Sequence, residues 1–147
     1  MRAPGRLLGL DLGSRRIGVA VTDSDQRVAT ALTVLERLSD PELDHAAVAG
    51  LVHEYGAVGV VVGLPLSMSG AAGPAARAVL EEVVRLRSHL DVEVDTFDER
   101  LSTVAASGAL RSAGSSARRQ RAVIDQTAAA LILQGWVDAR VHRGATA

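Results

Sequence analysis

Three carboxylates stand in three separate segments of the chain, and each adjoins a segment with a clear secondary-structure pattern. Asp11 lies in GLDLGSRRIGVAVTD, Glu99 in DTFDERLST and Asp125 in AVIDQTAAALIL. Clustered carboxylates commonly hold Mg²⁺ or Mn²⁺, because these hard cations prefer oxygen ligands and keep waters for chemistry on phosphates. If the fold gathers the three side chains, the sequence predicts a metal-dependent nuclease.

Each carboxylate also has a simpler structural interpretation. Asp11 precedes Gly13 in what could be an ordinary hairpin turn. Glu99 belongs to an acidic string that could be solvated surface, although strand alternation sends it and Asp98 to opposite sides. Asp125 could be a cap or first-turn acid of a helix. Against this last interpretation, an ionised side chain on an apolar face is costly unless paired or metal-bound, and the residues at i+3, i+4 and i+7 are Ala128, Ala129 and Ile132.

The three carboxylates would repel one another without a cation. Each like-charged pair at 4 Å costs about 4 kcal/mol at an effective dielectric constant of 20, and a divalent ion reverses the sign. Ions held there would lower the pKa of an attacking water and stabilise the leaving 3′-oxygen, which gives 5′-phosphate and 3′-hydroxyl ends. Either one ion or two would satisfy this chemistry.

Arginines adjoin all three carboxylates and are the candidate nucleic-acid contacts. Arg15 and Arg16 follow Asp11, and Arg100 follows Glu99, where it could bind substrate phosphate or brace the carboxylate. Residues 101–124 contain no acid but four arginines, which in isolation indicate a solvated loop. Beside a nuclease site this segment becomes a candidate phosphate clamp, formed by Arg118, Arg119 and Arg121 after Arg111.

The composition predicts a single α/β domain of ordinary size. The 147 residues suit one domain, with a core over about residues 6–141 and loose ends. Hydrophobic residues make up 48% and aromatic residues only 2%, so the core must consist of Ala, Val and Leu. With so few aromatic residues, stacking platforms for single-stranded bases are nearly absent. The net charge of −1 argues against a generally basic nucleic-acid coat.

The chain has no cysteine, which excludes disulfides, thiolate metal sites and cysteine nucleophiles. We see no signal peptide and no apolar run of membrane-spanning length, so we expect a cytoplasmic protein without membrane partners. The four histidines are expected on helix surfaces or in the tail, without a catalytic role. They are His45, His53, His89 and His142.

Hydrophobic periodicity predicts the element order β-β-β-α-β-α-β-α-α, which implies a five-stranded mixed sheet with helices on both faces. Ligands of such sheets gather at the carboxyl ends of strands, where Asp11 and Glu99 are expected. In the first helix, the face predicted to be buried carries Leu43, Ala47, Leu51 and Tyr55. The predicted strands are residues 6–12, 16–23, 28–34, 57–66 and 92–97, and the predicted helices are 41–56, 75–90, 102–110 and 123–141.

Four motifs resemble, in order and spacing, those of the YqgF (RuvX) family, over Leu7 to Asp138. They are GLDLGSRRIGVAVTD, VVGLPLSMSG, FDERLSTVAA and VIDQTAAALILQGWVD. The resemblance implies an RNase H-like fold similar to that of RuvC-type Holliday-junction resolvases. Two departures are small: SMSGAAGP stands where an acidic NMDG is more usual, which puts a role for that loop's acid in doubt, and RRQR stands where lysines are common.

The resemblance implies that Asp11, Glu99 and Asp125 are the acidic active-site residues. It further implies a nuclease, with Mg²⁺ or Mn²⁺, that matures the 5′ end of the 16S ribosomal RNA precursor as a monomer or homodimer. A resolvase of branched DNA and a non-catalytic RNA-binding ribosome-assembly factor are the alternatives. Sugar kinases, actin and Hsp70 chaperones also begin with a strand, an Asp and a Gly turn, but they need a second lobe that 147 residues cannot supply.

Overall fold

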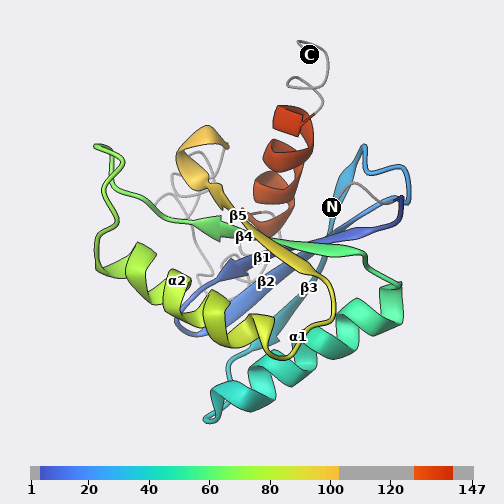
Figure 1. The fold of residues 1–147 in the computed structure, drawn as a ribbon, viewed down its shortest axis with the longest axis horizontal. Coiled ribbons are helices and arrows are strands. Elements are labelled where there is room, and N and C mark those ends of the chain that lie inside the picture. Colours follow the sequence, from blue (N-terminus) through green and yellow to red (C-terminus); the bar gives the residue numbers. More distant parts are fainter. Residues whose placement is uncertain (1–3, 103–127, 141–147) are drawn as a thin grey trace, which may run out of the picture.

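The computed structural model describes residues 4–102 and 128–140, which form one mixed five-stranded sheet with helices on both sides (Figure 1). The strand order is β3-β2-β1-β4-β5, so β1 and β4 are central. In chain order the elements are β1 (Leu7–Leu12), β2 (Arg16–Thr22), β3 (Ala29–Glu36), α1 (Pro41–Tyr55), β4 (Gly59–Leu64), α2 (Pro74–Arg87), β5 (Glu93–Asp98) and a 3₁₀ turn, η1 (Glu99–Leu101). Residues 128–140 are helical and are called the C-terminal helix below.

The predicted meander followed by α/β crossovers is confirmed. β1, β2 and β3 pair antiparallel through short turns, whereas β1, β4 and β5 pair parallel. Parallel neighbours need a long connection, and α1 and α2 provide the crossovers into β4 and β5. The third and fifth strands lie one or two residues later than predicted. Apart from Ser102, which follows η1, the predicted helix 102–110 lies outside the described residues.

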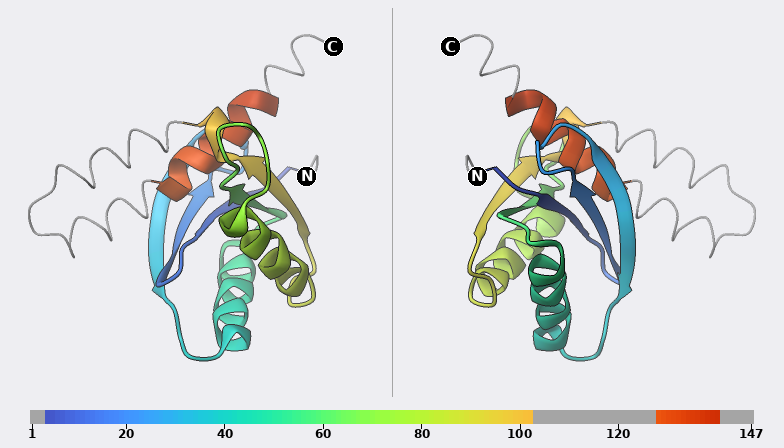
Figure 2. Two further views of the ribbon diagram at one scale, coloured as in Figure 1. Left: turned by 90° about the vertical axis from the view of Figure 1, so that its left-hand side faces the viewer. Right: turned by 90° about the vertical axis from the view of Figure 1, so that its right-hand side faces the viewer.

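The two faces of the sheet carry different helices, because side chains alternate along each strand. Leu8 and Leu10 of β1 pack with α1 and α2, in a core that includes Val48 and Val83. Leu7 packs on the other side with the C-terminal helix. Figure 2 shows α1 and α2 together on one side of the sheet and the C-terminal helix, in red, on the opposite side.

The prediction for the buried face of α1 is wrong by one residue, which is about 100° around the helix. Leu43 is 53% exposed, whereas Asp44 and His45 are 4% and 1% exposed and lie inward. Hence the expected surface position of His45 is also wrong. The apolar residues of α1 are spread around the helix, so polar contacts made by Asp44 and His45 select the buried face.

The other described helices bury apolar residues at helical spacing. α2 buries Val79, Val83 and Leu86. In the C-terminal helix Ala128 and Ile132 are fully buried, and Trp136 packs beside Phe97 with its indole N–H donating to Asp95 Oδ2 at 3.1 Å. No described helix is long and apolar enough to cross a membrane.

Candidate active site

Asp11 lies at the carboxyl end of β1 and on the face covered by the C-terminal helix. In β1 it is the fourth residue after Leu7, so alternation gives the two side chains the same face. Leu7 is in contact with the C-terminal helix. The Asp11 side chain is partly buried and pairs in register with Gly18 of β2, so no side chain of β2 lies across from it.

Glu99 is the first residue after β5, and its carboxylate lies over β4. A Cβ atom built on Gly63 would be 2.8 Å from Glu99 Oε1 and 2.5 Å from Ile132 Cδ1. Real Cβ atoms do not approach other atoms so closely, so the glycine leaves the room that Glu99 occupies. The Glu99 side chain therefore points from the edge strand toward the centre of the sheet, on the C-terminal-helix side.

Asp11 and Glu99 thus approach β4 from its two sides. Leu10 of β1 is in register with Val62 of the parallel strand β4. Asp11 and Gly63 are the next residues of these two strands, so they lie at the same level along the sheet. Gly63 in turn is in register with Phe97 of β5, two residues before Glu99. Both carboxylates therefore belong to the same edge and the same face of the sheet.

Asp125, the predicted third carboxylate, lies outside the described residues. The described part of the C-terminal helix begins three residues later, and Ala128 and Ala129 are completely buried. Among residues 4–102 and 128–140, no group of three His, Cys, Asp or Glu side chains could hold a metal ion. The donor set available there is a pair of carboxylates, whose oxygens suit Mg²⁺ or Mn²⁺.

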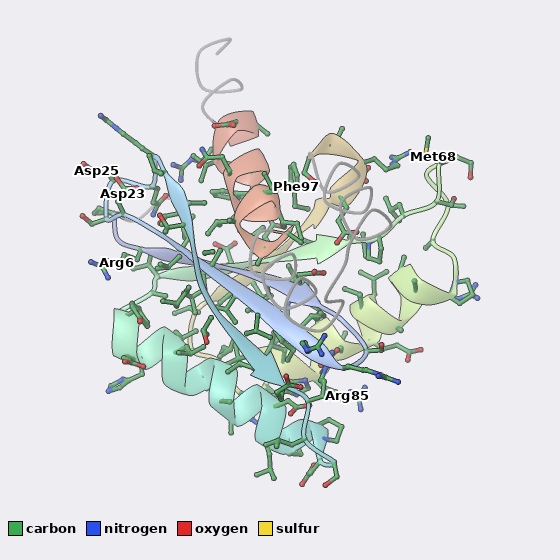
Figure 3. All side chains as sticks on the ribbon, turned by 180° about the vertical axis from the view of Figure 1, so that it is seen from behind. Arg6, Asp23, Asp25, Met68, Arg85 and Phe97 are labelled. Atoms are coloured by element: carbon green, nitrogen blue, oxygen red, sulfur yellow. The ribbon has the colours of Figure 1, made fainter. Side chains whose placement is uncertain are left out.

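Asp98 and Arg100 form an ion pair beside Glu99. Arg100 donates to Asp98 through Nε at 2.9 Å and Nη2 at 2.6 Å, and its backbone N–H donates to Asp98 Oδ1 at 3.0 Å. These hydrogen bonds from Arg100 hold the pKa of the partly buried Asp98 carboxyl below its usual value. Arg100 Nη1 also reaches the carbonyl oxygen of Met68 at 3.3 Å, and Figure 3 shows Met68 at the tip of the loop before α2.

The arginines next to Asp11 differ in their surroundings. Arg15 is exposed in the turn between β1 and β2, whereas Arg16 is in β2 and its side chain is only 14% exposed. Arg16 Nε lies 3.3 Å from Glu36 Oε1 of β3. Arg15, Arg16 and Arg100 remain candidates for phosphate contacts, and Arg118, Arg119 and Arg121 lie outside the described residues.

The turn after Asp11 depends on Gly13. The Gly13 N–H donates to the carbonyl oxygen of Arg16 at 2.9 Å, and a Cβ on Gly13 would lie only 2.7 Å from that oxygen. The Gly13 carbonyl in turn accepts from Arg37 Nε at 3.0 Å. No motif in the sequence indicates Arg37, whose one signal is that it is the only arginine or lysine between residues 28 and 76.

A family model described as "RuvX: Holliday junction resolvase" matches residues 5–139, which is most of the chain. The chain belongs to the RuvX family. Membership in this family confirms the resemblance found in the four motifs and supports the prediction of a nuclease, a hydrolase of phosphodiester bonds.

Relatives of this RuvX chain share almost half of its residues. A protein of Anaeromyxobacter dehalogenans is 49% identical over 92% of this chain and 98% of its own length. A protein of Nocardia farcinica is 48% identical over 92% of this chain and 79% of its own length. Both carry the name "Putative pre-16S rRNA nuclease".

The solved structure of Thermus thermophilus RuvC in complex with a Holliday junction substrate has the same fold. It superposes with a TM-score of 0.56 over 93% of this RuvX chain and 96% of the RuvC chain, at 16% identity. The prediction of an RNase H-like fold is therefore confirmed. At this identity the likeness concerns the fold and not the substrate.

Proposed function

We propose that this RuvX chain is a metal-dependent endonuclease that processes the 5′ end of the 16S ribosomal RNA precursor. The observation that carries the proposal is the approach of Asp11 and Glu99 from two sides of β4, on one face and at the carboxyl edge of the sheet. The names of the relatives that are 48–49% identical support the substrate. Such a substrate would place the reaction in the cytoplasm.

In this proposal Asp11, Glu99 and Asp125 hold Mg²⁺ or Mn²⁺ and are the catalytic carboxylates. An ionised carboxylate offers only acceptor oxygens, which suits a hard cation and repels a bare phosphate. A bound divalent cation supplies an acidified water and neutralises charge that develops on the phosphate. The carboxylates would orient the cation and its water. Because Gly63 has no side chain, the Glu99 carboxylate can lie over β4, on the same face of the sheet as Asp11.

Substrate binding is assigned to arginines around this edge. Arg15 is exposed and follows Asp11 in the turn. The Arg100 side chain is paired with Asp98 and is 36% exposed. Guanidinium groups bind phosphate oxygens through two parallel hydrogen bonds, which fixes the direction of the backbone as well as its charge. Arg16, Arg118, Arg119 and Arg121 complete the proposed phosphate-binding set.

The second candidate function is cleavage of a four-way DNA junction. The description of the matching family model favours it. A junction resolvase needs two sites in a symmetric pair of subunits, whereas processing of a precursor RNA needs one site. A non-catalytic assembly factor is less favoured, since a binding protein has no use for clustered acids that repel phosphate.

The deciding experiment compares cleavage of precursor 16S RNA and of a four-way DNA junction, with Mg²⁺ and with Mn²⁺. We expect wild type to cut the RNA, and Asp11→Asn to lose activity by about 10²-fold or more, because the variant removes a charged metal ligand. Asp91→Asn is the matched control, since Asp91 is exposed in the turn before β5. Equal activity of Asp11→Asn and wild type would reject this site.

A further inference from the structure

Arg37 connects the turn after Asp11 to α1 and α2, which cover the face of the sheet opposite to the Asp11 side chain. It directly follows β3, and its backbone N–H donates to the carbonyl oxygen of Arg15 at 2.8 Å. Its side-chain Nε donates to the carbonyl oxygen of Gly13 at 3.0 Å. Both acceptors belong to the turn between β1 and β2, so a single residue binds this turn through its main chain and its side chain.

Glu82 of α2 holds the remaining part of the Arg37 guanidinium. Arg37 Nη1 lies 2.5 Å from Glu82 Oε2, and Nη2 lies 2.9 Å from Glu82 Oε1. The side chains are only 18% and 12% exposed, and Asp44 Oδ2 of α1 is 3.6 Å from Nη1. Because the guanidinium is planar and rigid, the two bonds to Glu82 also fix the direction in which Nε points.

Glu82 is itself oriented from α1. His45 Nε2 lies 2.9 Å from Glu82 Oε2, and the His45 side chain is 1% exposed. Around His45, the ring of His89 is 5.5 Å away and pairs with Glu42, at 2.7 Å between Nε2 and Oε2. The contacts therefore run without interruption from α1 through Glu82 and Arg37 to the turn that follows Asp11.

We propose that Arg37 is a positioning residue for Asp11, held in place by Glu82, because it anchors the glycine-containing turn that sets the direction of the Asp11 carboxylate. A glycine turn is intrinsically flexible, so an external anchor has a large effect on its geometry. Asp11 is two residues before the anchored Gly13 carbonyl, and Gly13 N–H also lies 3.1 Å from the Asp11 carbonyl oxygen. The inference rests on the proposed function, in which Asp11 is a catalytic carboxylate.

The test is Arg37→Lys, with Arg87→Lys as the matched control. Lysine keeps a positive charge for Glu82, but a single ammonium cannot reproduce the fork and also reach Gly13. Arg87 donates through Nη2 to the carbonyl oxygen of Val94 at 3.0 Å, so its variant loses the same kind of bond near the amino end of β5. We expect kcat for RNA cleavage to fall roughly 10- to 100-fold in Arg37→Lys, with little change in KM. Arg87→Lys should keep the wild-type kcat.

Two measurements do not depend on cleavage. In Arg37→Lys, the backbone amides at positions 13 and 37 should lose protection from hydrogen exchange, while amides of β4 keep theirs. The affinity for Mn²⁺, measured by calorimetry, should fall roughly tenfold or more. A double variant, Arg37→Gln with Glu82→Gln, removes both charges together and should show the same losses, so it serves as a second test if Arg37→Lys does not fold.

Exchange and Mn²⁺ affinity in Arg37→Lys equal to those in Arg87→Lys would overturn the role of Arg37. This outcome is distinct from failure of the proposed function. If wild type cuts neither RNA nor DNA, the endonuclease proposal fails, whereas the exchange comparison still decides whether Arg37 anchors the turn.

Discussion

Gly63 shows how a residue without a side chain determines the place of Glu99, a proposed catalytic carboxylate. The space above it is shared by Glu99 Oε1 and Ile132 Cδ1, and a methyl group there would meet both. The carboxylate of Glu99 therefore lies over the centre of the sheet because β4 has a glycine at this level. Asp98, on the other side of the strand, is paired with Arg100 instead.

We predict that Gly63→Ala lowers cleavage by about tenfold or more and stability by about 1–3 kcal/mol, because the methyl group displaces Glu99 and crowds the core. Denaturant unfolding and cleavage rates would be measured on the same preparations. Gly50→Ala is the control, since a Cβ on Gly50 meets nothing within 4 Å. This helical substitution should stabilise the protein by roughly 0.5–1 kcal/mol.

A second substitution separates the two contacts of the Gly63→Ala methyl group. Ile132→Val removes the Cδ1 atom, which would lie 2.5 Å from the new methyl group, and leaves Cγ1 at 3.1 Å. The double variant therefore relieves most of the crowding in the core while Glu99 is still displaced. We expect stability to recover in part and cleavage to stay low. Recovery of both would show that the loss of cleavage comes from core packing and not from Glu99.

At the scale of elements, α1 and α2 carry a charged network within an otherwise apolar layer. Burial raises the pKa of Glu82, but the hydrogen bonds from Arg37 and His45 outweigh it, and the net pKa lies below the usual value. The same pairing raises the pKa of Arg37. Since the folded state lowers the pKa of Glu82, the ion pair stabilises the fold above the unfolded pKa, which is about 4.5.

We therefore predict that wild-type stability falls as the pH drops below about 4.5. In that range Glu82 binds a proton more strongly in the unfolded chain than in the folded one, so acid favours the unfolded state. Glu82→Gln should lose about 3 kcal/mol at pH 7, since it leaves Arg37 incompletely paired, and its stability should depend less on acid pH. Chemical denaturation across pH 3–7 measures both effects. Glu81→Gln, at an exposed neighbouring position, should behave as wild type.

The arginine segment before the C-terminal helix is predicted from the sequence to clamp phosphates. Replacing Arg118, Arg119 and Arg121 by Ala should weaken RNA binding and reduce the slope of log K against log salt by about 2–3, since each phosphate contact contributes about 0.7–0.9. Fluorescence anisotropy at several salt concentrations measures the slope. The control replaces three exposed arginines away from the site, Arg6, Arg27 and Arg85. Equal slopes in the two triple variants would reject the clamp.

At the scale of the whole molecule, the two faces of the sheet carry different groups of side chains. The face under α1 and α2 holds the charged network and, among the described residues, the larger of the two apolar clusters. The face under the C-terminal helix carries Asp11 and Glu99, which are 88 residues apart in the chain. Carboxylates brought together in this way favour binding of a cation to the folded state over the unfolded one.

We predict that Mn²⁺ or Mg²⁺ raises the melting temperature of wild type. At a concentration 100 times the Kd the gain is about 2.7 kcal/mol, which corresponds to roughly 5–10 °C for a domain of this size. Asp11→Asn should lose the shift. NaCl at the same ionic strength is the control, because screening alone relieves some carboxylate repulsion. No shift for wild type at millimolar metal would count strongly against a metal site.

Much of the fold could be predicted from the sequence because its signals are local. Continuous apolar runs mark β1 and β4, and glycines and prolines mark the turns between elements. The placement of Asp11 and Glu99 at strand ends followed from these boundaries. Alternation indicated that only one of Asp98 and Glu99 points into the site, and the resemblance to the family selected Glu99.

Only the tertiary structure decided which face of α1 is buried and what Arg37 does. The alanines and valines of α1 are compatible with more than one face, and the choice depends on contacts of Asp44 and His45 with other elements. Arg37 and Glu82 are 45 residues apart, and neither has a local pattern that indicates the other. A charged pair of this kind forms only where two separately formed elements meet, so its position depends on their packing and not on local periodicity.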